Sequence, residues 1–463
     1  MRRVLVTLVF AAVLAAAALP YYFGRQAEDS YRAWVQRIAQ QTTTIRPVTA
    51  EYRRGWLEST AETVVEEPPG VPRWRLSHRV VHGPFPYRAL GWRDLQPAQA
   101  VIDTQLESLE GQPTEIPAAL RTLVSLDGSA ATRVSGPSFA GPVPEAEGTR
   151  VRWEGVQGDV WFPADVSRIQ AQLKAPALRV NEPEGDWTAQ GMGLHVDLYQ
   201  GAAGLTLGRV ELGVGEIGFR APGDDVDLVR VRNWRVRSDS RAYGEFVRAS
   251  VELDVDSMAA AGTEVGPGRL AVEATRLDLQ TLGDLRRALQ DAAAQQDPGG
   301  SALLSLLQLG PQLLSHGPHL RVDAGLTTPN GPLRGDVLLV VTPGAPEASI
   351  LSSAWVDRLQ GDASLFVPSA LVATLTQALA SGQPSETSGE AGSEAEGDDA
   401  EGDDKAQRVQ QRLQEWLDSG YLLQEGDAYV ARLHLEDRRL TLNGRPLVEP
   451  QAETPAAPES EGP

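Results

Sequence analysis

The chain has 463 residues, of which 41% are hydrophobic and 6% aromatic, and it carries a formal net charge of −20 with no cysteine. A chain of this length can form two or three domains of ordinary size or one large domain. The lack of cysteine excludes a disulfide framework, a thiol nucleophile and a cysteine-based metal site. The acidic charge argues against nucleic acid as a partner, because phosphate binding needs a basic face.

The amino-terminal segment begins with two arginines after the first methionine and continues as an apolar run from Val4 to Phe23. Twenty helical residues span about 30 Å, which matches the hydrocarbon core of a bilayer. Because positively charged flanks stay in the cytoplasm, the rest of the chain would face outward. We therefore expect residues 1–24 to form a membrane anchor. A signal peptide cleaved near Ala15–Ala17 is the alternative.

Residues 25–44 are expected to form an amphipathic helix, ending near Gln41, and a linker. Apolar side chains follow the helical spacing i, i+3, i+4 and i+7 at Tyr31, Trp34, Val35 and Ile38. Such a stripe can lie on a membrane surface or dock on the domain that follows, and the sequence leaves both open.

From about residue 45 the hydrophobic period changes to two, as is typical of strands. Residues 247–255 alternate between apolar and polar without a break, and similar runs occur at 74–82, 166–180, 187–198, 205–219, 226–236 and 268–279. Strands that follow one another closely predict antiparallel pairing with one face covered. The expected fold class is α+β, mostly β, with large antiparallel sheets, a few amphipathic helices and one N-terminal transmembrane helix.

The apolar faces of these strands need a cover, and the helices at 281–296, 301–315 and 368–380 are few. Two sheets that face each other would cover the apolar side chains internally, so a sandwich is the expected arrangement of the β-rich domain, residues 45–380. The alternative is an elongated, partly open sheet whose concave face holds acyl chains.

The carboxy-terminal part alternates between ordered and low-complexity segments. Residues 381–404 contain nine acidic and no basic residues, and they cannot bury enough apolar surface to offset the entropy lost on ordering, so we expect a disordered insertion. Residues 405–448 would complete the domain with a helix over 405–417 and a β-hairpin. The remaining residues, 449–463, are expected to form a disordered tail.

The stretch GVGEIG, Gly213 to Gly218, matches the glycine pattern of dinucleotide-binding proteins. That function needs the pattern between a strand and a helix, where the pyrophosphate meets the helix N-terminus. Here the pattern lies inside an alternating run with no helix after it. We interpret it as a glycine-rich strand and expect no cofactor.

Metal-binding and catalytic patterns are weak in this sequence. His78 and His82 have the i, i+4 spacing of helical metal pairs, but on a strand they would stand about 13 Å apart, too far to share an ion. His316 and His319 lack a nearby carboxylate pair, and the aspartates of residues 224–227 lack the glycine and terminal glutamate of an EF-hand. We expect no metal ligands and no catalytic residues.

Four motifs resemble those of the YdgA-like family, which comprises bacterial membrane-anchored proteins of unknown function. They are YRRGWLES at 52–59, HGPFP at 82–86, GRLAVEATRLDLQTL at 268–282 and LTLNGRPL at 440–447. The resemblance covers nearly the whole chain. It implies a single-pass protein of the bacterial inner membrane with its bulk in the periplasm, and it supplies no catalytic residues.

The family-motif residues have a structural interpretation. They are Arg54, Gly55, His82, Gly83, Pro84, Phe85 and Pro86. In HGPFP, the glycine permits a sharp exit from a strand and the prolines remove two backbone donors. We expect Phe85 to plug the end of the sheet and His82 to form hydrogen bonds at the corner.

Two functions remain open on the sequence. The first is a non-enzymatic envelope protein that serves as a scaffold or binds a partner, with lipid handling as one form of it. Its expected partners are the membrane, through the N-terminal helix, and phospholipid or another envelope protein. Its open-sheet form would resemble the AsmA-like envelope proteins in architecture. The second is an envelope hydrolase whose site is assembled from residues distant in sequence.

Overall fold

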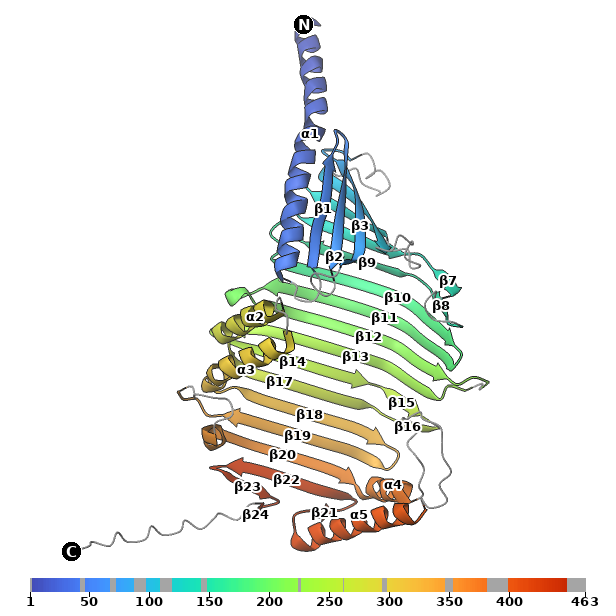
Figure 1. The fold of residues 1–463 in the computed structure, drawn as a ribbon, viewed down its shortest axis with the longest axis vertical. Coiled ribbons are helices and arrows are strands. Elements are labelled where there is room, and N and C mark those ends of the chain that lie inside the picture. Colours follow the sequence, from blue (N-terminus) through green and yellow to red (C-terminus); the bar gives the residue numbers. More distant parts are fainter. Residues whose placement is uncertain are drawn as a thin grey trace, which may run out of the picture. The chain divides into compact units, whose positions relative to one another are not determined.

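The computed structural model describes residues 2–41, 46–66, 72–86, 97–108, 119–142, 148–223, 226–260, 262–293, 298–345, 353–380 and 399–447. The chain divides into two compact units. Unit 1 comprises residues 1–268 and 277–313, and unit 2 comprises residues 269–276 and 314–463. The described strands pair antiparallel and five α-helices accompany them, which confirms the mostly β fold class (Figure 1). Within the described residues, no helix combines the length and apolarity needed to span a bilayer.

Unit 1 contains three helices and sixteen of the described strands. In chain order they are α1 (Arg2–Gln41), β1 (Arg46–Arg54), β2 (Glu58–Glu66), β3 (Pro72–His82), β4 (Ala98–Ser108), β5 (Ala119–Ser125), β6 (Ala130–Gly136), β7 (Phe139–Pro142), β8 (Arg150–Trp153), β9 (Val156–Phe162), β10 (Arg168–Glu182), β11 (Gly185–Gln200), β12 (Thr206–Arg220), β13 (Val229–Tyr243), β14 (Phe246–Val255), β15 (Ser257–Ala260), β16 (Thr263–Val265), α2 (Leu279–Ala293) and most of α3 (Pro298–Ser315). A short 3₁₀-helix, η2 (Ala202–Gly204), joins β11 to β12.

The strands of unit 1 form one antiparallel sheet. Pairing runs from β1 through β6 in chain order, continues through β9 and β10, and proceeds to β14. Strand β8 extends the other end of β10, and β15 extends β14 along β13. The expected sandwich is therefore wrong: in the described part of this unit, no second sheet faces the first. Most of these strands pair with their neighbour along the chain, so the sheet grows sideways in one layer.

Helix α1 docks on one end of this sheet. Ala27, Tyr31 and Trp34 are buried, and the Trp34 ring packs edge to face on Phe162 of β9 at 5.2 Å. Arg37 donates to the carbonyl of Ala164 at 2.6 Å. The sequence left open whether the amphipathic stripe lies on a membrane surface or docks on the following domain, and in the structure it docks. The side chains of residues 1–17, most of the expected anchor, lie outside the described residues.

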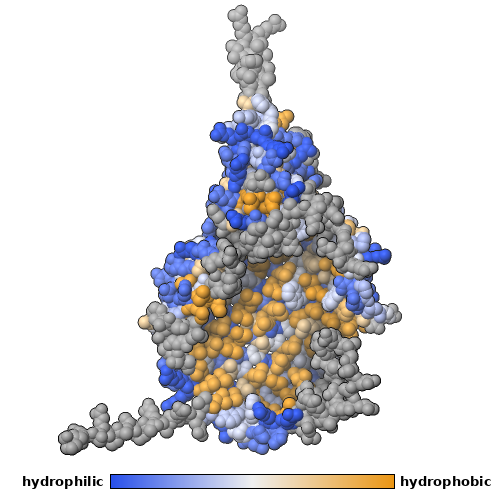
Figure 2. Space-filling model, in the orientation of Figure 1, coloured by the Kyte–Doolittle hydropathy of each residue, from blue (hydrophilic) through white to orange (hydrophobic). Residues whose placement is uncertain are grey.

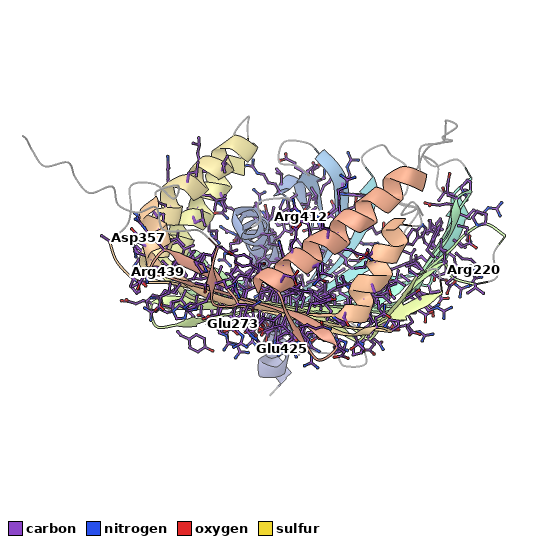
Figure 3. The ribbon with its side chains drawn as sticks, turned by 90° about the horizontal axis from the view of Figure 1, so that it is seen from below. Arg220, Glu273, Asp357, Arg412, Glu425 and Arg439 are labelled. Carbon is purple, nitrogen blue, oxygen red and sulfur yellow. The ribbon has the colours of Figure 1, made fainter. Side chains whose placement is uncertain are left out.

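Unit 2 contains β17 (Gly268–Asp278) for the most part, β18 (His319–Thr328), β19 (Gly331–Val341), η3 (Ser353–Arg358), β20 (Leu359–Pro368), α4 (Ser369–Ala380), α5 (Asp399–Ser419), β21 (Leu423–Glu425), β22 (Ala428–Glu436), β23 (Arg439–Leu442) and β24 (Arg445–Pro446). Strands β18, β19, β20, β22 and β23 pair in that order. Figure 3 shows α4 and α5 on one side of these strands.

The predicted acidic insertion, residues 381–404, overlaps helix α5 at its carboxy-terminal end. Helix α5 begins at Asp399 and so includes the last six residues of the predicted segment 381–404. Residues 381–398 and the predicted tail from residue 449 lie outside the described residues.

Candidate functional site

The sheet of unit 1 has one aliphatic face. Cross-strand partners in an antiparallel sheet point to the same side, so the register defines rows of side chains that cross β10 to β14. Two neighbouring rows are Leu173, Leu194, Leu212, Val236 and Leu253, and Ala171, Val196, Val210, Ser238 and Val251. Nine of these ten side chains are apolar.

The opposite face carries a ladder of ion pairs. Arg168 binds Asp197 through two hydrogen bonds of 2.7 Å, and Arg209 lies 3.3 Å from Asp239. Glu211, next to Leu212 on β12, lies 3.7 Å from Arg237. Exposed pairs of this kind contribute only about 0–1 kcal/mol each. The ion pairs make this face hydrophilic, whereas the aliphatic face is hydrophobic.

A line of irregular residues crosses the sheet at one level. The register places Pro176, Gly191, Gly215, Asn233 and Asp256 opposite one another in β10, β11, β12, β13 and the β14–β15 junction, and regular pairing skips these positions. We call this line the crease. Gly191 and Asn233 have φ angles of 65° and 50°, and the Asn233 amide donates to Asp256 at 2.7 Å.

Across the crease, the apolar positions of each strand change from even to odd residue numbers, or from odd to even. On β11, Met192 and Leu194 belong to the aliphatic set on one side of it, and Ala189 and Trp187 belong to that set on the other. The rows beyond the crease are Leu178, Ala189, Ile217, Val231 and Met258, and Val180, Trp187, Phe219, Val229 and Ala260. One interruption per strand, with the pairing register unchanged on its two sides, thus keeps apolar side chains on a single face. Figure 1 shows that β10 to β13 bend along their length.

The aliphatic face is largely uncovered in the described part of unit 1. Trp187, Leu212 and Val251 are 45%, 39% and 48% exposed. Figure 1 shows α2 and α3 only at one end of β12 to β14, and Figure 2 shows hydrophobic side chains gathered over the middle of these strands. A contiguous exposed apolar surface of this kind is a candidate interaction site.

Unit 2 separately repeats this division of faces. One row of its strands reads Val322, Val337, Ala363, Leu433 and Leu442. The other side carries Arg432, which binds Glu425 at 2.8 and 2.9 Å, and His434, which binds Asp362 at 2.8 Å. The carboxylates of Asp362 and Glu436 accept hydrogen bonds from the ring of exposed His434 and raise its pKa.

The family-motif histidine, His82, lies at the corner where α1 meets the sheet. It is buried, with Nε2 2.8 Å from the Ser59 hydroxyl and Nδ1 3.0 Å from the Trp56 carbonyl. A Cβ on Gly24 of α1 would lie 2.4 Å from its ring, so only glycine lets the helix approach this closely. Burial lowers the pKa of His82.

The other motif residues gather at the same corner. A Cβ on Gly83 would lie 1.8 Å from the Ala98 carbonyl, and a Cβ on Gly55 would lie 2.2 Å from the Glu58 carbonyl. Arg54 lies 5.2 Å from the Tyr21 ring of α1 and 3.4 Å from Glu28. The family-motif residues therefore lie together where α1 docks on the sheet.

Phe85 does not plug the sheet as expected, because its side chain is 63% exposed. The buried members of HGPFP are His82, Gly83 and Pro86. The chain leaves β3 sharply at Gly83, whose backbone N–H donates to the Gln99 carbonyl at 2.6 Å. That turn directs Phe85 outward.

The other sequence candidates are dispersed. GVGEIG lies inside β12, the strand expected for it, and His319 begins β18. Asp227 binds Arg220 and Arg230, while Asp224 and Asp225 lie outside the described residues. Among the residues that the structure describes, no group of three histidine or acidic side chains could hold a metal ion.

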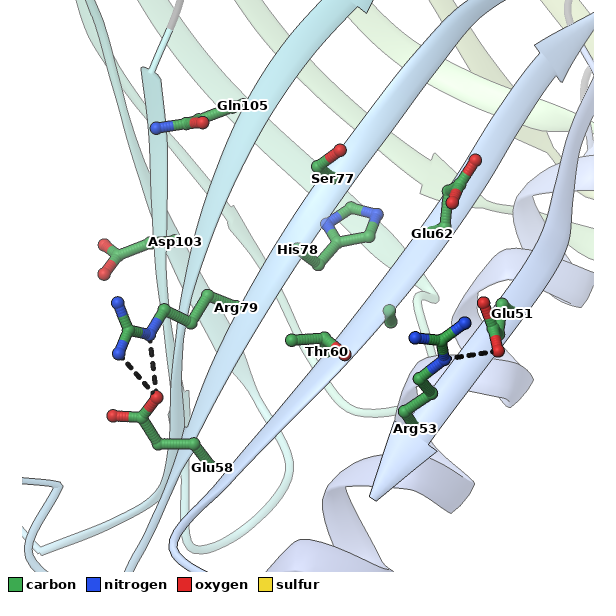
Figure 4. Close-up of a pocket in the computed structure, with 11 residues that line it drawn as sticks. Glu51, Arg53, Glu58, Thr60, Glu62, Ser77, His78, Arg79, Asp103 and Gln105 are labelled. Atoms are coloured by element: carbon green, nitrogen blue, oxygen red, sulfur yellow. Dashed lines mark hydrogen bonds and ion pairs between the residues drawn. The ribbon is translucent and has the colours of Figure 1, made fainter. Parts of the chain in front are cut away.

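A polar hollow of about 730 Å³ lies on β1 to β4, and no sequence motif indicates it. Its charged side chains bind one another: Arg79 binds Glu58 at 2.7 Å and Arg53 binds Glu51 at 2.5 Å (Figure 4). Asp103 on its wall binds Arg121 at 2.7 Å. The hollow resembles the ion-paired face of β10 to β14 rather than a catalytic cluster.

Residues 1–450 match a protein family described as a bacterial protein of unknown function, DUF945. The chain belongs to this bacterial family. A comparison with curated proteins found no match. The match confirms the expectation of a bacterial family of unknown function that spans the chain, whereas the narrower YdgA-like grouping rests on the sequence motifs alone.

Proposed function

We propose that this DUF945 protein is a non-enzymatic envelope protein that binds acyl chains of phospholipid on the aliphatic face of its unit 1 sheet. The single observation that carries the proposal is the one-sided sheet, with five-residue aliphatic rows on one face and ion pairs on the other. An apolar ligand gains by leaving water on such a face, at about 0.8 kcal/mol per buried CH₂ group.

The dimensions suit one acyl chain. Five strands with about 4.8 Å between neighbours give a row of roughly 19 Å. One leaflet of a bilayer core is about 15 Å deep, half of the roughly 30 Å core. A row from β10 to β14 is therefore long enough for one extended chain.

The chemistry favours hydrocarbon over polypeptide. A protein strand or helix end placed on this face would bring backbone N–H and C=O groups that find no partner there, since only Ser238 in the two central rows carries a polar side chain. Hydrocarbon needs no hydrogen-bond partners. The proposal therefore names phospholipid rather than another envelope protein as the ligand.

We also propose where the protein is located. The apolar run from Val4 to Phe23 and the two arginines before it support an anchor in the bacterial inner membrane, with both units in the periplasm. An anchored protein of this kind holds its apolar face near a source of acyl chains.

The test compares two neighbouring residues of β11 that point to opposite faces. The full-length chain is purified in mild detergent, and bound phospholipid is extracted and quantified by mass spectrometry for Leu194→Glu and His195→Glu. We expect Leu194→Glu to lose most of the bound phospholipid and His195→Glu to retain it. Equal amounts in both variants, or no phospholipid in the unsubstituted protein, would contradict the proposal.

A further inference from the structure

A groove of about 400 Å³ lies between α1 and the sheet of unit 1. Its roof is α1, with Trp34, Val35 and Ile38, and its floor is formed by β2 to β5, with Leu76 and Ile102 among the floor residues. Ile38 is 38% exposed at the rim. The docked helix thus leaves a gap beneath its carboxy-terminal half.

The polar side chains in the groove bind one another. The Tyr31 hydroxyl of α1 shares a short hydrogen bond with Thr63 of β2, whose hydroxyl lies 2.8 Å from Nε2 of His78 on β3. Nδ1 of His78 lies 2.8 Å from the Thr104 hydroxyl on β4. This chain of four side chains joins the helix to three strands. It satisfies its members and leaves aliphatic and aromatic surface for an occupant.

The groove floor and the aliphatic face of β10 to β14 are the same side of one sheet. Ile102 pairs with Thr122, Thr122 with Thr132, and Thr132 with Val160. Val160 pairs with Ala171, which opens the second aliphatic row. A ligand in the groove therefore lies on the same surface as a ligand on the open face.

We propose that the groove beneath α1 binds a single acyl chain of a phospholipid and is the covered end of the acyl-binding face. This inference rests on the proposed function and adds a site to it. A peptide helix is not the expected occupant, because one turn of about 10 Å diameter and 5.4 Å length already has the volume of the groove, roughly 400 Å³. An extended peptide is excluded by chemistry, because its backbone would find the polar groups of the groove already bonded.

The position of the groove on α1 supports an acyl chain as the occupant. The same helix begins with the apolar run proposed as the anchor, so the groove is the part of the aliphatic face closest to that segment along the helix. A chain that leaves the bilayer would be shielded from water by Trp34 and Ile38 before it reaches the open strands.

The test places the photo-crosslinking residue p-benzoylphenylalanine at one site at a time in the full-length chain. The sites are Ile38 at the groove, Gln36 on the exposed side of α1 as the matched control, and Leu212 on the open face. The protein is reconstituted in vesicles of phosphatidylethanolamine and phosphatidylglycerol, extracted in mild detergent, irradiated and analysed by intact mass. Far-ultraviolet circular dichroism checks that each variant is folded.

We expect phospholipid adducts at Ile38 and Leu212 at several-fold higher yield than at Gln36. Adducts at Leu212 but not at Ile38 above the Gln36 level would overturn the groove inference and leave the proposed function standing. Adducts at Ile38 alone would support the groove and contradict binding on the open face. A polypeptide adduct at Ile38, or no adduct at either site, would also overturn the inference.

Discussion

At the residue scale, the corner at His82 explains why a motif without catalytic chemistry is built from particular residue types. Gly24 and Gly83 provide close approach, and His82 connects β2, β3 and the turn at Trp56 with both ring nitrogens. The sequence predicted a structural role for HGPFP but also predicted a buried Phe85, because proline positions locate a turn without showing which way the next side chain points.

We expect His82→Ala to destabilise the protein more than Phe85→Ala does. Loss of the buried ring leaves the Ser59 hydroxyl and the Trp56 carbonyl without this partner, at a cost of about 1–3 kcal/mol. Truncation of an exposed phenylalanine to alanine costs about 0.5 kcal/mol or less of stability. Urea unfolding of the two variants measures the difference, and a larger loss for Phe85→Ala would mean that the phenylalanine is buried after all.

His78 should make stability depend on pH. Burial lowers its pKa to about 4 in the folded protein, against 6.5 for an unperturbed histidine. Below pH 6.5 the unfolded chain takes up a proton that the folded protein does not, so stability is lost as pH falls from 6.5 to 4, by on the order of 3 kcal/mol in total.

The measurement is the free energy of unfolding between pH 7.5 and 4.5, in the unsubstituted protein and in His78→Gln. Glutamine does not titrate, so the loss with falling pH should be smaller in the variant. The pKa of His82 is also lowered, but His82 is present in both proteins and cancels in the comparison. Equal slopes would show that His78 does not cause the pH dependence.

At the element scale, the crease keeps apolar side chains on one face of a sheet whose strands β10 to β13 bend. Local alternation predicted these strands well: β14 spans Phe246–Val255 where the sequence indicated 247–255. The crease itself was missed. Its signal was present in β11, where the apolar positions change from even at Met192 to odd at Ala189, but one strand cannot show that its neighbours change at the same level.

Gly191→Ala should cost about 1–2 kcal/mol, because Gly191 has a φ of 65° and an L-residue is strained there. Gly193→Ala on the same strand is the matched control. The nearest atom to its Cβ would be 3.9 Å away, and its φ is not positive, so we expect little loss. Thermal unfolding of both variants tests this, and equal stability would mean that the crease does not depend on the backbone conformation of Gly191.

At the scale of the whole molecule, each unit by itself presents one aliphatic and one ion-paired face. The period of two in the sequence was enough to predict antiparallel strands with faces of different polarity. It could not say what covers the apolar face, since a strand of a sandwich and a strand of an open sheet have the same alternation. Likewise, the stripe from Tyr31 to Ile38 predicted a helix, and only the contacts with Thr63 and Phe162 place it on the sheet.

The most direct test of acyl binding is photo-crosslinking in living cells from two adjacent residues on opposite faces. The full-length chain carries p-benzoylphenylalanine at Leu194 or at His195, the cells are irradiated, and adducts are identified by mass spectrometry. We predict phospholipid adducts from Leu194 and none from His195. Adducts with polypeptide alone from Leu194, or equal phospholipid yields from both positions, would contradict the account.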